Sequence, residues 1–444
     1  MQQRADHPSW ELSFDESGQL TAADGDQFVR EVADAGITEL FVLAHGWDTD
    51  RESAELLYRA MFPLVAEAAH KAMPGSTLGF LGVHWPSLWF PDPPPDAAAR
   101  TATAGQPGAA DATLSGQEMA QTLAESLSDP ASQQAVHRMG QLVDAGVAGA
   151  GTEADAAQQA RLAEFHGLVQ TLLPGGPQPV EDSGETSLLQ SLDPRRDYAR
   201  MVDILGGAAP AGSAQGLGDQ FSKVWEGAKH VLRTLSYYQM KGRAGTVGEK
   251  GLGPLVEQLG ARCPGIRVHL IGHSFGARLV AFALRGTSSA AASPVASLSL
   301  IQGAFSHWAF TRRTPFGEPG ALNDVADRVH GPLVATFSEY DWAVGRWYPR
   351  ASALAQEDAE HAEPVSLRWG AMGADGFQGV EPVTGLFLLP EGQPYALSSG
   401  CFYQVDGASV IADTSESSFS GAHSDIEHAE VAWLIVSAAA AGRA

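Results

Sequence analysis

The fold is decided by residues 268–280, which read Val-His-Leu-Ile-Gly-His-Ser-Phe-Gly-Ala-Arg-Leu-Val. An apolar run of strand type comes first, a Gly-x-Ser-x-Gly turn follows, and apolar residues with helical spacing continue after it. A nucleophile elbow requires this context, because its serine sits on a sharp turn above the end of a sheet. Ser274 is the predicted nucleophile, and Gly272 and Gly276 are the small residues that let strand and helix approach the turn closely.

Apolar runs and helical periodicity alternate on both sides of this turn. Strands are predicted at residues 39–44, 77–84, 266–271, 296–302, 332–338 and 402–411, and an edge hairpin at 10–14 and 18–21. Helices are predicted at residues 26–35, 53–73, 221–240, 247–262, 277–285, 321–329, 351–358 and 428–440. Such alternation is typical of helices on both faces of a mainly parallel sheet, so we predict a doubly wound α/β fold.

Residues 91–218 interrupt this alternation. The interval is rich in Ala, Gly, Gln and Ser, and helical pieces occur within it at 116–128, 133–145 and 156–173. Their apolar stripes favour a large, mostly helical cap over an active site, and the alternative is a loosely ordered, low-complexity insertion. The predicted division is therefore a first core segment at 1–90, a cap insertion at 91–218 and a second core segment at 219–444.

Charge and composition limit the possible partners. The 444 residues carry a formal net charge of −24 without a Lys/Arg cluster, so we expect no binding to nucleic acid or to an anionic membrane surface. The acidity is best explained as a contribution to solubility. The alternative is that it attracts a cationic ligand toward the protein. No run is long and apolar enough for a transmembrane segment, and the first residues lack a secretory signal, so we expect a cytoplasmic protein. Cys263 and Cys401 are expected to be free thiols.

A serine nucleophile needs a base, and an acid that orients the base. In the elbow fold the order along the chain is serine, acid, histidine, with the last two in loops after later strands. Asp341 follows the predicted strand at 332–338 and is the predicted acid, with Glu339 as the alternative. Asp324 and Asp327 fall on a predicted helix and are expected to face solvent.

His423 is the predicted base. It follows the strand at 402–411 and a polar loop, just before the last helix, where an imidazole can reach over the nucleophile. His428 is the alternative, but it falls on the helix and is expected to be a surface or packing residue. Asp425 is expected to cap the helix or to support the histidine loop.

Two backbone N–H groups are predicted to form an oxyanion hole. One belongs to Phe275, directly after the nucleophile, and the other to Trp47, in a loop after the strand at 39–44. His45 and Gly46 are expected to turn the chain so that the Trp47 N–H points into the site.

Aromatic residues after two other strands are candidate pocket walls. Trp85 lies in the aromatic stretch 84–90, and His307 and Trp308 follow the strand at 296–302; with His45 they predict a site for an apolar acyl or aryl group. The alternative is that these aromatic side chains anchor the cap or fill the core. Because the sequence contains no metal-ligand spacing, phosphate loop or dinucleotide fingerprint, we expect neither a metal nor an organic cofactor.

Together these features resemble the α/β-hydrolase superfamily from about residue 39 to residue 436, outside the insertion. The resemblance rests on the His45-Gly46-Trp47 turn, the elbow around Ser274, Asp341 and His423. Residues 271–279, 341–345 and 423–426 are also similar to bacterial α/β-hydrolase-like proteins of uncertain substrate.

The resemblance implies hydrolysis of an ester, thioester or amide bond by a Ser-His-Asp triad, without a metal or organic cofactor. On analogy of fold, we expect a carboxylic-ester hydrolase that acts on a small, apolar acyl substrate, with a thioesterase or a peptidase as alternatives. The rival from another class is a non-catalytic binding or scaffold protein that keeps the fold, because the insertion could block the site or recruit a partner.

Overall fold

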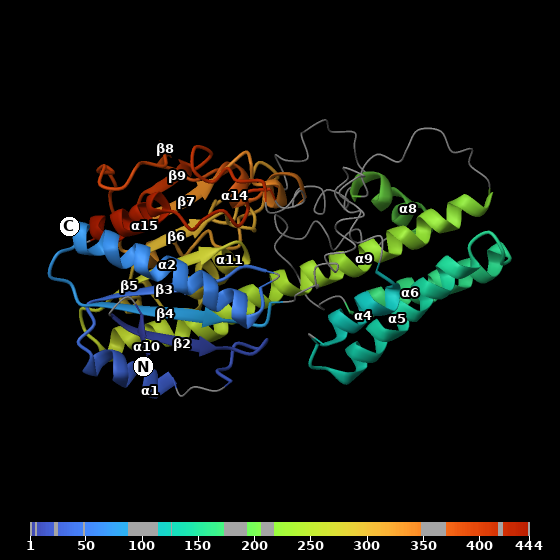
Figure 1. The fold of residues 1–444 in the computed structure, drawn as a ribbon, viewed down its shortest axis with the longest axis horizontal. Helices are drawn as coiled ribbons and strands as arrows, with labels where there is room; N and C mark the ends of the chain where they lie inside the picture. Colours follow the sequence, from blue (N-terminus) through green and yellow to red (C-terminus); the bar gives the residue numbers. More distant parts are fainter. Residues whose placement is uncertain are drawn as a thin grey trace.

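A computed structural model of the chain describes residues 2–4, 7–21, 25–47, 49–87, 114–125, 127–172, 193–205, 217–347, 370–415 and 421–442. These residues form an α/β core and a group of helices beside it, which the long helix α9 (Leu217–Thr246) joins (Figure 1). Among the described helices, none combines the length and the apolar character that crossing a membrane requires.

The core is built on one nine-stranded sheet with the order β1-β2-β4-β3-β5-β6-β7-β9-β8. Its strands are β1 (Gln2–Arg4), β2 (His7–Ser13), β3 (Glu39–Ala44), β4 (Leu78–His84), β5 (Arg267–His273), β6 (Val295–Ile301), β7 (Leu333–Phe337), β8 (Val383–Phe387) and β9 (Phe402–Asp406). Only β1 and β2 pair antiparallel, so the strands from β2 to β8 form an eight-stranded, all-parallel sheet. The predicted α/β class and the mainly parallel sheet are therefore confirmed.

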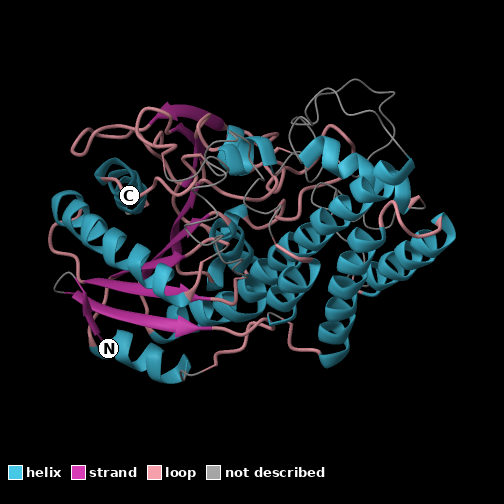
Figure 2. Cartoon of the chain, turned by 45° about the vertical axis from the view of Figure 1, so that its right-hand side comes forward, coloured by secondary structure: helices cyan, strands magenta, loops and turns pink. Residues whose placement is uncertain are grey.

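Helices cover both faces of this sheet (Figures 1 and 2). On one face lie α1 (Gly25–Asp34), α10 (Gly253–Arg262) and α11 (Phe275–Ala283), and on the other α2 (Arg51–Ala72) and α15 (Ala429–Ala441). Successive residues of β3 alternate between the two apolar cores: Leu40 and Val42 join the first, Phe41 and Leu43 the second. Burial on both faces explains why the parallel strands are continuous apolar runs in the sequence.

Aromatic side chains pack together within the second group of helices, and its apolar residues are continuous with the core on one face of the sheet. Its members are α4 (Gly116–Glu125), α5 (Pro130–Gly149), α6 (Asp155–Thr171), α8 (Pro194–Leu205) and the first half of α9. Phe165 packs edge-on against Trp225 and Tyr198, with ring centroids 6.2 and 5.8 Å apart, and the Trp225 indole N–H donates to Gln158 Oε1 over 2.7 Å. A Cβ at Gly146 would lie 2.0 Å from the Trp225 ring, so glycine is what allows this packing. The described parts of the insertion are therefore mainly helical.

Two predicted β-elements of the core are wrong in part. Residues 18–21 form no strand beyond a single bridge between Phe14 and Leu20, and β1 provides the antiparallel edge instead. The predicted strand at 402–411 stops at Asp406, because Val410 and Ile411 donate their N–H groups back to Gly407 in a turn.

Two predicted helices also differ. Between 321 and 329 only the short 3₁₀ turn η6 (Ala326–Arg328) forms, and the Asn323 side chain bonds to the Gly320 carbonyl, which favours a turn over a helix. The helix at 247–262 is divided into a π-helical turn, η3 (Val247–Leu252), and α10. The helix at 351–358 lies outside the described residues.

The remaining described elements are short. They are η4 (Leu284–Gly286), η5 (Ala290–Ala292), η7 (Ala343–Trp347) and α14 (Met372–Asp375). The edge strand β8 was not predicted, because most of its side chains are exposed and its sequence carries no apolar run. Its Phe387 side chain is 70% exposed.

Candidate active site

The predicted site residues gather at the carboxyl edge of the sheet, where β3 and β5 lie side by side. Ala44 of β3 pairs with Gly272 of β5, so the loops after both strands leave the sheet at the same place. The chain builds β4 on one side of β3 and then continues with β5 on the other side, which makes this position a topological switch point. Ligands of open α/β sheets bind in the crevice at such points. The strand arrows of β2 and β4 point toward the group of helices, so this edge faces that group (Figure 1).

Ser274 sits on a strained turn between β5 and α11. Its φ of 57° and ψ of −123° are rare for a residue with a side chain, and such strain persists only where the surroundings enforce it. A Cβ at Gly272 would lie 2.3 Å from the Gly276 carbonyl oxygen, and a Cβ at Gly276 would lie 2.1 Å from that of Ala44. Both positions therefore need glycine, as the motif predicted. Ser274 also precedes the first residue of α11, where the helix dipole favours negative charge.

Ser274, His423 and Asp341 form one chain of hydrogen bonds. His423 Nε2 lies 2.8 Å from Ser274 Oγ, and His423 Nδ1 lies 2.7 Å from Asp341 Oδ2. Because a carboxylate can only accept, Nδ1 carries the proton and donates it to Asp341, and Nε2 is left to accept from the serine hydroxyl. Asp341 is only 1% exposed and Ser274 only 5%, so both ends of this row of hydrogen bonds are shielded from bulk water.

The loop that carries His423 is fastened to the loop that carries the acid. Gly421 forms a bridge with Asp341, and the Ala422 N–H donates to the Tyr340 carbonyl over 2.9 Å. On the far side of His423, the Asp425 carboxylate accepts the N–H groups of Ala412 and Asp413 at 2.9 and 2.8 Å. Asp425 therefore supports this loop, which is one of the two structural roles expected for it.

The two alternatives from the sequence are placed differently. His428 bonds to Asp425 Oδ1 through Nε2 over 2.7 Å, at the start of α15. Glu339 lies in the same β7 loop as Asp341, but Asp341 is the residue whose carboxylate meets His423. The hydrogen bonds of the site thus join Ser274, His423 and Asp341.

His273, inside the elbow, also contacts the predicted base. Its Nε2 lies 2.9 Å from the His423 carbonyl oxygen, and the two rings are 4.9 Å apart. Burial lowers the pKa of His273 to about 3, so its imidazole stays neutral and Nε2–H donates to this carbonyl. The sequence motif contains His273, but nothing in the motif indicates this contact.

The loop after β3 lies directly against the nucleophile. A Cβ at Gly46 would come within 2.8 Å of Ser274 Cβ and 3.3 Å of its Oγ, so only glycine lets the backbone approach this closely. The loop with Gly46 and Trp47 therefore lies next to the turn with Ser274 and Phe275. The backbones of Trp47 and Phe275 are predicted to supply the oxyanion hole, and their rings also touch edge-on, with centroids 6.3 Å apart.

His45 and Trp85 support this loop from behind. The Trp85 backbone N–H donates to His45 Nε2 over 3.4 Å, its indole N–H donates to the His45 carbonyl over 3.0 Å, and the two rings stack 5.7 Å apart. Burial lowers the pKa of His45 to about 3, and the neutral ring can donate Nδ1–H to the Gly46 carbonyl 3.0 Å away. The other two pocket candidates, His307 and Trp308, are also buried, and His307 pairs with Asp375 over 2.7 Å.

One aromatic residue beside the nucleophile comes from a helix that the sequence did not connect with the site. Tyr237 of α9 lies 5.1 Å from the Phe275 ring and 6.0 Å from the Trp47 ring, with the latter pair perpendicular at 89°. Because the first half of α9 belongs to the helical group, this helix links that group physically to the residues around Ser274.

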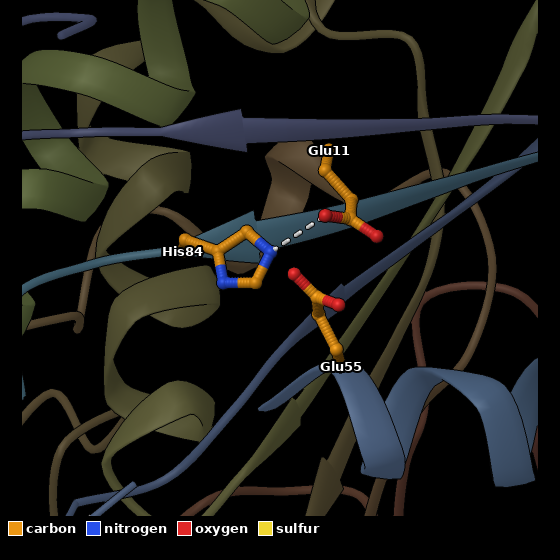
Figure 3. Close-up of side chains that lie close together, drawn as sticks. All are labelled: Glu11, Glu55 and His84. Carbon is orange, nitrogen blue, oxygen red and sulfur yellow. Dashed lines mark hydrogen bonds and ion pairs between the residues drawn. The ribbon is translucent and has the colours of Figure 1, made fainter. Parts of the chain in front are cut away.

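Glu11, Glu55 and His84 are the side chains with the geometry of a metal site among the described residues. They point toward one another from β2, α2 and β4, with potential ligand atoms within 4.8 Å (Figure 3). Arg51, however, already bonds to both carboxylates, to Glu11 over 3.4 Å and to Glu55 over 3.2 Å. A divalent cation would have to displace this guanidinium, so we assign the cluster as an ion-pair network that joins these three elements.

The site as a whole thus offers a strained serine, an imidazole in contact with it, and a buried carboxylate bonded to the imidazole. No protein-family model, curated protein or solved structure matches the chain significantly. Its function therefore has to be inferred from the geometry of these residues.

Proposed function

We propose that the protein is a serine hydrolase that cleaves carboxylic esters through an acyl-enzyme on Ser274. The observation that carries the proposal is the continuous chain from Ser274 Oγ through both nitrogens of His423 to Asp341 Oδ2, at 2.8 and 2.7 Å. This arrangement places a general base on the hydroxyl and a carboxylate behind the base, which together can activate an otherwise poorly reactive serine.

In the proposed reaction, Ser274 Oγ attacks the acyl carbonyl carbon while His423 Nε2 takes the hydroxyl proton. Asp341 stabilises the resulting imidazolium through its bond to Nδ1–H. The carbonyl oxygen becomes negatively charged in the tetrahedral intermediate, and the backbone N–H groups of Phe275 and Trp47 donate to it. His423 then protonates the leaving alcohol, and water releases the acid by the same steps. These groups account for the reaction without a metal or an organic cofactor.

The order of the three residues along the chain supports membership of the α/β-hydrolase superfamily. Serine, acid and histidine follow β5, β7 and β9, as the elbow fold requires. The nucleophile follows the strand next to the one whose loop is proposed to supply the second oxyanion donor. We propose further that the helical group is a cap, because the carboxyl edge faces it and α9 connects the two.

Three rings beside the nucleophile support an apolar acyl group as the substrate. Trp47, Phe275 and Tyr237 pack against one another within 6.3 Å and border the turn that carries Ser274. Aromatic walls of this kind favour an apolar acyl chain over a charged one. The same catalytic residues could open thioesters or amides, so the choice of an ester rests on analogy of fold.

A fluorophosphonate probe tests the proposal directly. Wild-type protein should be labelled, and labelling should disappear in Ser274→Ala. The matched control is Ser288→Ala, which removes an exposed hydroxyl that bonds to Glu257, and it should be labelled like wild type. Absence of labelling in folded wild-type protein would leave the non-catalytic binding or scaffold protein as the better interpretation.

A further inference from the structure

Gln302 follows β6 directly and, like the nucleophile, has a positive φ. Its φ is 46°, and among the described residues only Ser274 and Gln302 combine a positive φ with a side chain. Ser274 and Gln302 are equivalent positions of neighbouring strands, because each directly follows one member of the pair His273 (β5) and Ile301 (β6). The Ser274 N–H donates to the Ile301 carbonyl over 3.1 Å. Strain at this second position requires an explanation from its surroundings.

The Gln302 side chain is fully buried and bonds to the predicted acid. Its Nε2 lies 2.9 Å from Asp341 Oδ2, the same oxygen that accepts the hydrogen bond from His423 Nδ1–H. The other carboxylate oxygen, Oδ1, accepts the Val344 N–H over 3.2 Å. The buried carboxylate is therefore held by one donor from the base and two donors from the protein around it.

Thr336 fixes which end of the amide faces the acid. Its hydroxyl oxygen accepts the Gln302 backbone N–H over 3.0 Å, so its single proton is available for Gln302 Oε1 at 2.9 Å. On the other side, Nε2 faces the carbonyl of Gly373 at 3.5 Å. A reversed amide would turn its oxygen toward a carboxylate and a carbonyl, which can only accept, so the orientation with N–H toward Asp341 is the consistent one.

The space around Gln302 also leaves this side chain little freedom. A Cβ at Gly373 would lie 2.6 Å from the Gln302 carbonyl carbon, so the two backbones are in close contact. Thr336 of β7 closes the opposite side. A long side chain held at both ends of its amide is preorganised rather than free to follow Asp341.

We propose that Gln302, with Thr336 behind it, is a positioning residue that holds the Asp341 carboxylate in line with His423 Nδ1. This inference rests on the proposed hydrolase function. A neutral amide suits the task, because it satisfies one lone pair of a buried carboxylate without cancelling the negative charge that stabilises the imidazolium. An arginine or lysine there would compete with His423 for that charge.

The first test is Gln302→Met, which keeps an unbranched side chain of similar length and removes the amide. We expect kcat on 4-nitrophenyl acetate to fall about 10- to 100-fold, the effect of losing one hydrogen bond to a charged group. KM should stay within about twofold, because Gln302 touches Asp341 and not the acyl group. Gln302→Asn is a second variant that tolerates a positive φ but is one methylene too short to reach the acid, so it should lose activity in the same way.

Thr336 supplies a matched pair of variants. Thr336→Val removes the hydroxyl that orients the amide and should lower kcat in the same direction, whereas Thr336→Ser keeps the hydroxyl and should restore it. Equal activity of the valine and serine variants would contradict the orienting role of Thr336.

A double-mutant cycle with Asp341→Asn separates positioning from a general structural role. If Gln302 acts through the acid, Gln302→Met should cause little further loss of kcat once Asp341 is asparagine. A loss of the same size in both backgrounds, or none in the wild-type background, overturns the inference. Failure of the proposed function looks different, since wild-type protein would then show no Ser274-dependent turnover or labelling.

Discussion

The α/β core and the helical group were predictable from the sequence to different degrees. The central strands β3, β5 and β6 are buried on both faces, so each is an apolar run that can be recognised in the sequence. The residues that follow them lie along one edge of the sheet. The helical group packs around Trp225, and its apolar residues join the core on one face of the sheet. The individual helices of this group can be predicted from the sequence. The side chains that the group places next to Ser274 cannot.

This contrast suggests that the two regions do separate work. All three residues of the proposed triad and both predicted oxyanion donors belong to the core. The helical group contributes α9, whose Tyr237 touches Phe275 beside the nucleophile. Changes in the core should therefore lower the rate for every substrate, whereas changes in the helical group should alter preference among substrates.

The largest expected effect comes from the acid. Asp341→Asn should lower kcat by about 10⁴-fold, because an amide at this position favours the wrong histidine tautomer. Glu339→Gln, two residues earlier in the same loop, is the control and should remain within a few-fold of wild type. Turnover of 4-nitrophenyl acetate measures both, and the reverse ranking would move the acid to Glu339.

A smaller loss is expected when the oxyanion turn is displaced. Gly46→Ala places a Cβ 2.8 Å from Ser274 Cβ, so the turn must shift and the donor on Trp47 is misplaced. We expect kcat to fall by about 100-fold, the usual result of losing one such donor. The matched change in the helical group is Gly167→Ala on α6, where a Cβ meets no atom within 4 Å. Its kcat should equal that of wild type.

Disturbing the core of the helical group should change selectivity more than rate. Gly146→Ala forces a Cβ into the Trp225 ring and should destabilise this group by roughly 1–3 kcal/mol, as overpacking does. We expect kcat on a short acetate ester to change by less than about tenfold while the preference between short and long acyl chains shifts. Turnover of 4-nitrophenyl esters of increasing acyl length measures this preference. A uniform loss of kcat over all chain lengths would show that the helical group does not set substrate preference separately from rate.

The effect on turnover is expected to be smallest for the buried histidines, whose contribution is to stability at low pH. Burial lowers the pKa of both His45 and His273 to about 3, below the 6.5 of an ordinary imidazole. The unfolded chain therefore binds more protons between these values, so stability is complete above pH 6.5 and is lost as the pH falls toward 3. Each group contributes at most about 1.4 kcal/mol per pH unit in this range.

His273→Gln should make this dependence less steep, because an amide can still donate to the His423 carbonyl but does not titrate. Urea unfolding at several pH values between 4 and 7 measures the slope. An unchanged slope in the variant would mean that His273 is not the neutral, buried group described above.

The sequence predicted the site better than its surroundings. Ser274, Asp341 and His423 could be chosen because each follows a recognisable strand, and the structure brings the three together. Gln302 could not be chosen, since a single glutamine after a strand forms no pattern and its relevance depends on a positive φ and on contacts with distant residues.

The same physical reason explains the errors in the fold. β8 lies at the exposed edge of the sheet and lacks the apolar run that marks its neighbours. Residues 321–329 carry apolar side chains with helical spacing, but side-chain bonds such as that of Asn323 to the Gly320 carbonyl stabilise turns instead. Apolar runs predicted the buried strands correctly. They gave no indication of local side-chain hydrogen bonds that compete with a helix.

The central claim is that Ser274 becomes acylated during turnover. The most direct measurement is acid-quenched peptide mass spectrometry of wild-type protein mixed with 4-nitrophenyl acetate, with His423→Ala treated in parallel. We predict one acetyl group on the peptide that contains Ser274 in the wild-type protein and none on that peptide in the variant. Acetylation confined to lysines, or equal acetylation of Ser274 in both proteins, would contradict the proposed mechanism.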